Sequence, residues 1–214
     1  MEALILLGAP GAGKGTAAER LVARLGVRHV SSGDLLRGAV KQGTPAGQEA
    51  EGYMKQGKLV PDELIGRIIT DLLVAGGSPL KVLLDGFPRT VAQAEMLEKV
   101  VSAQQGRLRG TVLLEVAEEI LVERLAGRRL CPKCNAGYHV RTLPPKVSGT
   151  CDRCGTPLVQ RTDDTAETVR QRLAVFRQDT SPLIEWYNSR GLLKRVDGVG
   201  SADDVTERIV QALR

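Results

Sequence analysis

GAPGAGKGT, residues 8–16, follows directly on the apolar run 3–7 and leads into an amphipathic stretch, 16–25. A buried strand that breaks into a glycine-rich turn and then a helix forms a phosphate cradle. Glycines let backbone N–H groups converge on anionic oxygens, and the helix start near Lys14 adds the positive end of its dipole. Lys14 supplies a mobile positive charge for the outer phosphates. The stretch therefore predicts a P-loop.

The residue after the lysine departs from the usual P-loop pattern. A Ser or Thr normally stands there and offers its hydroxyl to Mg²⁺, but Gly15 occupies the position and Thr16 comes one residue later. Direct ligation of Mg²⁺ by a hydroxyl of this loop is therefore not expected. A purely structural glycine turn is the alternative interpretation. The strand before the loop and the helix after it favour the phosphate site.

The composition is that of a globular chain of 214 residues. Aromatic residues make up only 3% of it, so Leu, Val, Ile and Ala must fill the core. No stretch approaches the roughly 20 apolar residues that a membrane span needs. The first residues carry no basic leader and no small-residue cleavage site, so we expect no secretion signal and a cytoplasmic location. We expect no membrane partner, and nothing in the sequence demands more than a monomer.

Positive charge is concentrated in residues 124–172, which hold ten Lys and Arg against four Asp and Glu. Such a segment is typical of nucleic-acid binding or of a cover over a polyphosphate, although solvated surface charge is also common. Binding of single strands by stacking needs several aromatic side chains, and Tyr138 is the only Phe, Trp or Tyr in the segment. We therefore favour the polyphosphate and expect no nucleic-acid partner.

Strand-like and helical patterns alternate and predict an α/β fold with a parallel sheet covered on both faces. The expected strands are 3–7, 28–30, 82–84, 111–116 and 192–196. Pro61 suits the first position of a helix, and Thr90 suits the N-cap of a helix running to about Gln104. In such sheets ligands bind beyond the carboxyl ends of the strands, where the glycine loop and the turns 31–34 and 85–89 are expected to meet.

The four cysteines form two C-x2-C pairs, Cys131 with Cys134 and Cys151 with Cys154, separated by sixteen residues. Each pair can bring two thiolates to one tetrahedral cation, and the spacing is typical of Cys₄ zinc sites. Four unrelated thiols are one alternative, and a redox pair is another that would leave two cysteines unexplained. Four sulfur ligands leave no open position, so we predict a structural metal, zinc, with iron or cobalt also able to bind.

Six sequence motifs, in this order and spacing, resemble adenylate kinase over essentially the whole chain. They are GAPGAGKGT (8–16), SSGDLLR (31–37), GKLVPDE (57–63), LLDGFPRT (83–90), GRR (127–129) and TDDTAETVRQRL (162–173). The segment that carries the cysteines is similar to the zinc-bearing lid of the bacterial type.

The resemblance implies an α/β fold with a P-loop NTPase core and a five-stranded parallel sheet, interrupted by two insertions. The core would comprise 1–30, 61–126 and 165–214, the nucleoside-monophosphate-binding domain 31–60, and the zinc-binding lid 127–164. The implied reaction is reversible phosphoryl transfer from Mg·ATP to AMP, giving two ADP. Such a transfer depends on positioning and positive charge, and on a mobile lid that excludes water. Gly127 and the segment around Asp163 are the expected hinges.

The resemblance also implies the site residues. The ATP site would comprise Gly11, Ala12, Gly13, Lys14, Gly15, Thr16, Arg124, Arg128, Gly137, Tyr138 and Gly200. The AMP site would comprise Ser32, Arg37, Lys58, Leu59, Val60, Gly86, Phe87, Pro88, Arg89, Gln93, Arg161 and Arg172. The catalytic residues would be Lys14, Asp85, Arg89, Arg128, Arg161 and Arg172. A single arginine is more often surface charge than ligand, but guanidinium groups at six matching positions favour a phosphate site.

Some residues have more specific expected roles. Asp85 ends an apolar strand and is expected to hold Mg²⁺ through water. Gln93 can pair with an adenine edge, and Thr90, where UMP/CMP kinases have asparagine, favours AMP. Asp163 and Asp164 resemble lid-hinge carboxylates, which would make a closed-state contact, cap the following helix, or both. Another nucleoside-monophosphate kinase is the first alternative function, and a zinc-ribbon ATPase that binds nucleic acid is the second.

Overall fold

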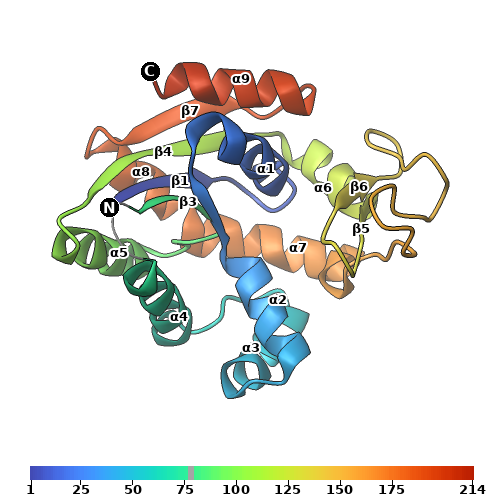
Figure 1. The fold of residues 1–214 in the computed structure, drawn as a ribbon, viewed down its shortest axis with the longest axis horizontal. Coiled ribbons are helices and arrows are strands. Elements are labelled where there is room, and N and C mark those ends of the chain that lie inside the picture. Colours follow the sequence, from blue (N-terminus) through green and yellow to red (C-terminus); the bar gives the residue numbers. More distant parts are fainter. Residues whose placement is uncertain (77–79) are drawn as a thin grey trace.

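The computed structural model describes residues 1–76 and 80–214. At its centre lies a parallel sheet of five strands in the order β2-β3-β1-β4-β7 (Figure 1). The strands are β1 (Glu2–Leu7), β2 (Arg28–Ser31), β3 (Lys81–Asp85), β4 (Arg107–Glu115) and β7 (Leu193–Asp197). The predicted α/β core with five parallel strands is confirmed, and β4 begins four residues earlier than the sequence pattern indicated.

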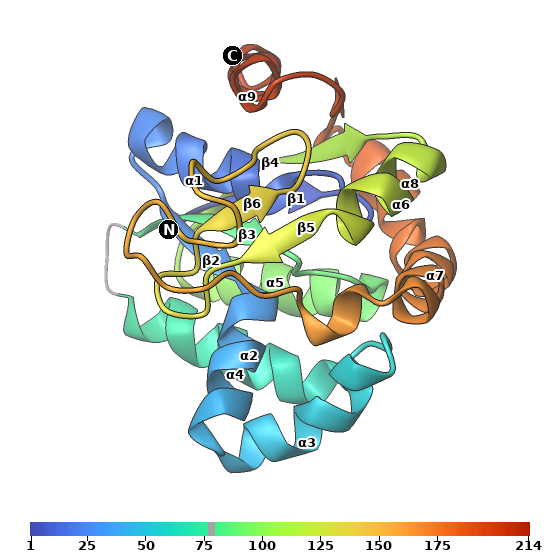
Figure 2. The ribbon, with the colours of Figure 1, turned by 90° about the vertical axis from the view of Figure 1, so that its right-hand side faces the viewer.

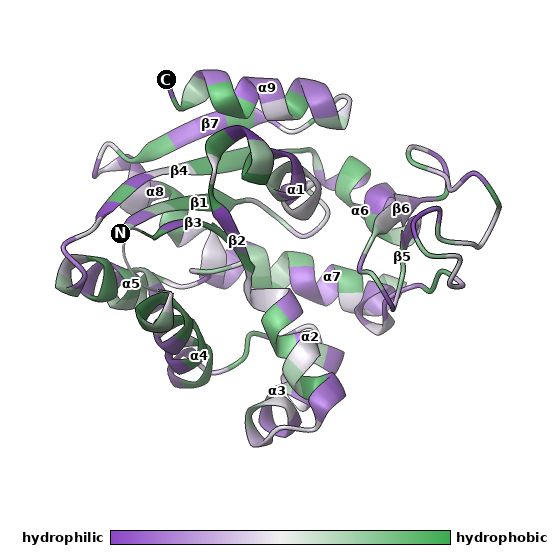
Figure 3. Cartoon of the chain, viewed as in Figure 1, coloured by the Kyte–Doolittle hydropathy of each residue, from purple (hydrophilic) through white to green (hydrophobic). Residues whose placement is uncertain are grey.

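The side chains of β1 alternate between two apolar clusters, because successive strand residues point to opposite faces of a sheet. Ala3, Ile5 and Leu7 belong to one cluster, and Leu4 and Leu6 to the other. The first cluster includes side chains of α4 (Asp62–Ala75), α5 (Val91–Ala103) and α8 (Pro182–Asn188). The second includes side chains of α1 (Lys14–Leu25), α6 (Glu118–Ala126), α7 (Ala166–Val175) and α9 (Ala202–Ala212). The sheet is thus covered on both faces. Its central strands are apolar, whereas hydrophilic and hydrophobic residues alternate along α9 (Figure 3).

The P-loop turns through three glycines with positive φ, namely Gly8, Gly11 and Gly13. Gly11 also packs tightly, because a Cβ there would lie 3.0 Å from the carbonyl oxygen of Leu121 in α6. Helix α1 begins at Lys14, two residues before the start of the amphipathic stretch. Only glycine combines this left-handed backbone with so close an approach, so the loop conformation is encoded locally.

The predicted helix starts are right in one case and wrong in two. Thr90 caps α5 as predicted, its Oγ1 accepting the N–H of Gln93 at 3.1 Å. Pro61 is the N-cap residue of α4 instead of its first helical residue, because its ψ of 138° is extended. Thr165 caps α7, so neither Asp163 nor Asp164 does; both carboxylates lie in a short 3₁₀ turn and pair with arginines instead.

Two segments stand outside the sheet and its covering helices (Figures 1 and 2). Helices α2 (Ser32–Gln42) and α3 (Pro45–Lys55) pack side by side in the segment 31–60. Strands β5 (Arg128–Leu130) and β6 (Gly137–His139) pair antiparallel in the segment 127–164. Within the described parts of the chain, no helix combines the length and the apolar character needed to cross a bilayer.

Candidate active site

The turns that follow β1, β2 and β3 meet at one edge of the sheet. Asp85, the last residue of β3, is in register with Leu6 of β1 on one side and with Ser31 of β2 on the other. The P-loop and the turns 31–34 and 85–89 therefore start from adjacent strand ends. This is the carboxyl edge at which parallel sheets bind ligands, as the sequence pattern predicted.

Lys14 lies at the centre of this edge and is half-buried. Its Nζ donates hydrogen bonds to the carbonyl oxygens of Gly8 and Ala9 at 2.7 and 3.0 Å. Burial lowers the pKa of Lys14 to about 8, an effect that Asp85 opposes and that Arg89 reinforces. Desolvation disfavours a positive charge that only neutral carbonyls contact, so an anion bound beside Lys14 would stabilise the charged ammonium group.

Asp85 faces the position that the missing P-loop hydroxyl would occupy. A Cβ built on Gly15 would lie 3.6 Å from Asp85 Oδ2, and the same oxygen lies 3.5 Å from His29 Nε2. Asp85 is 9% exposed. A carboxylate oxygen beside the open side of a phosphate loop suits a hydrated Mg²⁺, which prefers oxygen ligands and retains several waters.

Arg37, Arg89, Arg128, Arg161 and Arg172 gather around these turns, where burial and mutual repulsion lower the pKa of Arg89, Arg161 and Arg172. Burial, followed by the charge of Arg172, lowers the pKa of Arg89 to about 10. Burial, followed by Arg37 and then Arg128, lowers the pKa of Arg161 to about 10. The Nε of Arg161 is buried without a hydrogen-bond partner in the described part of the chain. Crowded guanidinium groups with an unused donor form a site for a polyanion.

A cleft opens beside the arginines, between the core and the segment 31–60. Its walls are apolar where Leu36, Met54 and Ile65 line it, and charged at Arg37, Arg89, Arg172 and Asp163. The remaining lining residues are Ser32, Gly33, Gly57, Lys58, Leu59, Val60, Gly86 and Gln93. The lining thus combines guanidinium groups that suit an anion with apolar side chains that suit a flat apolar group.

The cleft collects nine of the twelve residues that the resemblance implied for the AMP site. Phe87, Pro88 and Arg161 are not in the described lining, and Phe87 packs in an apolar cluster instead. Sequence reasoning missed Leu36, Met54 and Ile65, whose apolar spacing is that of any buried helix face. It also gave no role to Asp62, whose carboxylate contacts Gln93.

The residues implied for the ATP site are distributed over three places. Arg124 Nη2 donates to the carbonyl oxygen of Gly198 at 3.0 Å and Nη1 to that of Ala12 at 3.5 Å, which joins α6, the P-loop and the loop that contains Gly200. Burial lowers the pKa of Arg124. Gly137 is exposed in β6. Tyr138 is buried beside the cysteines, its hydroxyl accepting the N–H of Asp152 at 2.8 Å.

The four cysteine sulfurs lie within 4.8 Å of one another. Neighbouring Sγ atoms are 3.4 Å apart in Cys131–Cys154, 3.5 Å in Cys134–Cys151 and 3.6 Å in Cys134–Cys154. A tetrahedral zinc with Zn–S bonds of about 2.3 Å separates its sulfurs by about 3.8 Å. These separations exceed the length of a disulfide bond and fit a Cys₄ metal site. Two of the sulfurs are buried.

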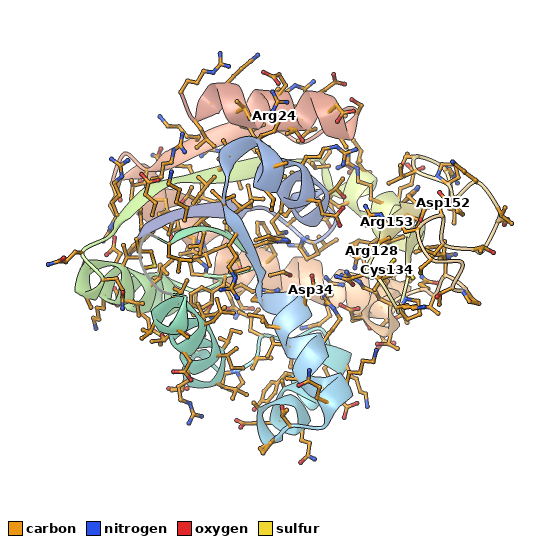
Figure 4. All side chains as sticks on the ribbon, viewed as in Figure 1. Arg24, Asp34, Arg128, Cys134, Asp152 and Arg153 are labelled. Carbon is orange, nitrogen blue, oxygen red and sulfur yellow. The ribbon has the colours of Figure 1, made fainter. Side chains whose placement is uncertain are left out.

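Each cysteine pair places one neighbouring side chain against another part of the molecule. Asn135, which follows Cys134 with a φ of 59°, donates from Nδ2 to Oδ2 of Asp34 in α2 at 3.3 Å. Arg153, between Cys151 and Cys154, lies 3.6 Å from the carboxylate of Glu19 in α1. Figure 4 labels Cys134 and Arg153 on the segment 127–164 and Asp34 at the near end of α2. The segment 127–164 thus contacts α2 and α1 through these two side chains.

Comparison with known proteins agrees with the geometry. The family model described as adenylate kinase matches residues 6–192. A protein of Moorella thermoacetica named adenylate kinase is 50% identical over 210 residues, which is 98% of this chain and 97% of that protein. An adenylate kinase of Carboxydothermus hydrogenoformans is 47% identical over 99% of both chains, and one of Syntrophobacter fumaroxidans is 47% identical over 98% of this chain and 99% of its own.

Proposed function

The chain belongs to the adenylate kinase family and is a nucleoside-monophosphate kinase, and from this premise we propose that it transfers the γ-phosphoryl group of Mg·ATP reversibly to AMP, giving two ADP. The observation that carries the proposal is the cleft between the core and the segment 31–60, whose lining combines Arg37, Arg89 and Arg172 with apolar side chains. ATP, AMP and ADP are then the substrates and products.

The acceptor AMP binds in the cleft in this proposal. Arg37 and Arg89 hold its phosphate, and the apolar walls hold its base, while Gln93 contacts the adenine edge. The charged end of the cleft includes Arg172, and the buried Arg161 repels Arg37 and thus lies within range of the same anion. Planar guanidinium groups grip phosphate oxygens in pairs and keep their charge during the transfer.

The donor ATP binds on the P-loop side. Its outer phosphates replace the carbonyl contacts of Lys14, and Arg128 approaches from the lid while Arg124 and the loop at Gly200 lie toward the adenine. Positioning and charge supply most of the catalysis, because a phosphoryl transfer needs little covalent chemistry from the protein. Asp85 would hold Mg²⁺ through water, and the ion would supply positive charge to offset that of the phosphates.

Residues 127–164 act as a lid over the donor, and residues 31–60 as the acceptor domain. We propose that the four cysteines hold a structural zinc that keeps the lid folded, since the lid's own apolar cluster is small. Closure excludes water, which would otherwise accept the phosphoryl group. Reopening to release products then limits turnover. We also propose that the protein acts as a monomer in the cytoplasm, without a nucleic-acid or membrane partner.

A coupled assay of ADP formation tests the proposal with AMP, GMP, CMP and UMP in turn. Wild type is compared with Arg89→Ala and with a control, Arg109→Ala, which removes an exposed arginine from β4. We expect AMP to be preferred, and Arg89→Ala alone to lose several orders of magnitude in kcat/KM. Preference for another monophosphate would overturn the substrate. Absence of any transfer, with salt-dependent binding of an oligonucleotide, would favour a nucleic-acid-binding ATPase.

A further inference from the structure

Asp62 is not among the residues that line the cleft, but its carboxylate contacts the side-chain amide of Gln93, which is. Asp62 is the first residue of α4. Its Oδ1 accepts a hydrogen bond from Gln93 Nε2 at 2.6 Å, and its Oδ2 accepts one from Thr90 Oγ1 at 2.9 Å. Gln93 lines the cleft and is only 2% exposed, so its amide has few other partners. Both oxygens of Asp62 are therefore committed to the start of α5.

The orientation of the Gln93 amide is fixed by its two protein partners. The backbone N–H of Arg89 donates to Gln93 Oε1 at 2.8 Å. A backbone N–H can only donate, and an ionised carboxylate can only accept. An amide turned by 180° would set its NH₂ against the N–H of Arg89 and its oxygen against Asp62. Both contacts would be repulsive in a buried site, so the turned amide is disfavoured.

A fixed amide offers one order of donor and acceptor to a base. After its two protein contacts, Gln93 retains one N–H and one oxygen lone pair. Adenine presents an amino donor beside a ring-nitrogen acceptor, which a glutamine matches in a bidentate pair. Guanine presents a carbonyl acceptor beside a ring N–H donor, which is the reverse order. Guanine would be matched only by the turned amide.

We propose that Asp62 is a positioning residue that determines base specificity, because it locks the Gln93 amide in the orientation that accepts a 6-amino purine and rejects a 6-oxo purine. The inference rests on the proposed function, since it assigns the cleft to the monophosphate. Thr90 supports the lock by holding the second oxygen of Asp62. Sites built around a defined hydrogen-bond pattern reject the mismatched ligand strongly, because the mismatch leaves buried polar groups unpaired.

Asp62→Asn tests the lock, because an asparagine amide can offer either a donor or an acceptor to Gln93 and so removes one of the two contacts that oppose the turn, leaving only the N–H of Arg89. We expect the ratio of kcat/KM for AMP over GMP to fall roughly tenfold or more, with KM for ATP unchanged. The matched control is Glu63→Gln, which removes the same charge from an exposed residue in the same helical turn. Its ratio should equal that of wild type.

A double-mutant cycle distinguishes a merely structural role of Asp62 from the proposed positioning of Gln93. In a Gln93→Ala background, Asp62→Asn should leave the AMP-over-GMP ratio unchanged, because no amide remains to be locked. If Asp62→Asn loses the far-UV circular dichroism of the wild type, Asp62→Ser replaces it, since serine is accepted at a helix start and can donate or accept.

Binding of AMP and GMP without ATP, measured by calorimetry, keeps the two proposals distinguishable. Absence of phosphoryl transfer by wild type would overturn the proposed function, while the ratio of the two dissociation constants would still test the lock. Equal affinity of wild type for AMP and GMP would overturn the lock. An unchanged ratio in Asp62→Asn, or an equal fall in the Gln93→Ala background, would overturn it as well.

Discussion

Asp164 accepts hydrogen bonds from Nε and Nη2 of Arg128 on its two carboxylate oxygens, at 2.7 and 2.5 Å, across 36 residues of sequence. The two residues stand at opposite ends of the segment 127–164, so one ion pair closes its base. The Asp164 side chain has no exposed surface, and its Oδ1 also receives Arg172 Nη1 from α7 at 3.1 Å. One buried carboxylate thus joins both ends of the lid to the core.

Asp164→Asn should destabilise the protein, because it leaves Arg128 and Arg172 partly buried and facing each other without a shared anion. We expect the free energy of unfolding to fall by about 2–3 kcal/mol. Urea unfolding followed by circular dichroism measures the change. The matched control, Asp163→Asn, removes a carboxylate that contacts Arg172 through one 3.0 Å pair, and should lose less. Equal losses in the two variants would contradict this account.

Nucleotide binding should take up protons above pH 8, because the half-buried Lys14 has a pKa of about 8 and needs its charge to hold phosphate. At pH 8.5 the phosphates of ATP are already ionised. Calorimetry in two buffers of different ionisation enthalpy should therefore report uptake of up to about three quarters of a proton from Lys14. In Lys14→Arg, whose guanidinium stays charged, uptake should vanish. Uptake that persists in this variant would assign the proton to another group.

The lowered pKa of Lys14 should also affect the stability of the protein without nucleotide. The folded pKa of Lys14, about 8, lies below the ordinary lysine value of 10.5, so above pH 8 the unfolded chain binds more protons at this residue. The contribution of Lys14 to the free energy of unfolding should therefore rise with pH between about 8 and 10.5. Thermal unfolding of wild type relative to Lys14→Met, at several pH values, measures it. A difference that stays constant with pH would contradict the shift.

Removal of metal by a chelator should lower the melting temperature without abolishing activity at low temperature. If the Cys₄ site holds the lid folded, its binding free energy is folding free energy. A loss of about 3 kcal/mol would lower the melting temperature by roughly 6–12 °C. Differential scanning calorimetry and an ADP-formation assay at 10 °C measure the two effects. Immediate loss of activity with unchanged melting would indicate a catalytic metal.

Gly127→Ala should loosen the base of the lid. A Cβ at Gly127 would lie 2.2 Å from Nε2 of His139, whose ring is 8% exposed and accepts the N–H groups of Arg141 and Thr142 on Nδ1. The ring cannot yield without breaking these contacts, so we expect reduced amide protection across β5 and β6 in hydrogen exchange. Gly137→Ala is the control, since nothing lies within 4 Å of its added Cβ. Unchanged protection in Gly127→Ala would show that the ring moves aside freely.

The P-loop, the sheet and the cysteine site could be predicted from sequence because each depends on local features. Glycines at 8, 11 and 13 encode a left-handed turn, the alternation along residues 3–7 serves two apolar clusters, and C-x2-C spacing brings sulfurs to one point. These patterns hold wherever the segment is placed, since they concern neighbouring residues. The same reasoning misplaced the start of α4 by one residue at Pro61, whose backbone is extended, and left helix capping open at Asp163, whose carboxylate pairs with Arg172 instead.

Only the tertiary structure decided which side chains face one another. Asp62 contacts Gln93 across 31 residues, Asp34 contacts Asn135 across 101, and Arg128 contacts Asp164 across 36. None of these pairs shares a helix turn or a strand ladder, so no periodicity links their positions. Their geometry follows from the register of the sheet and from the docking of two inserted segments on it. Sequence alone therefore determined the fold and the class of chemistry, and the docking decided how the residues of the site are oriented.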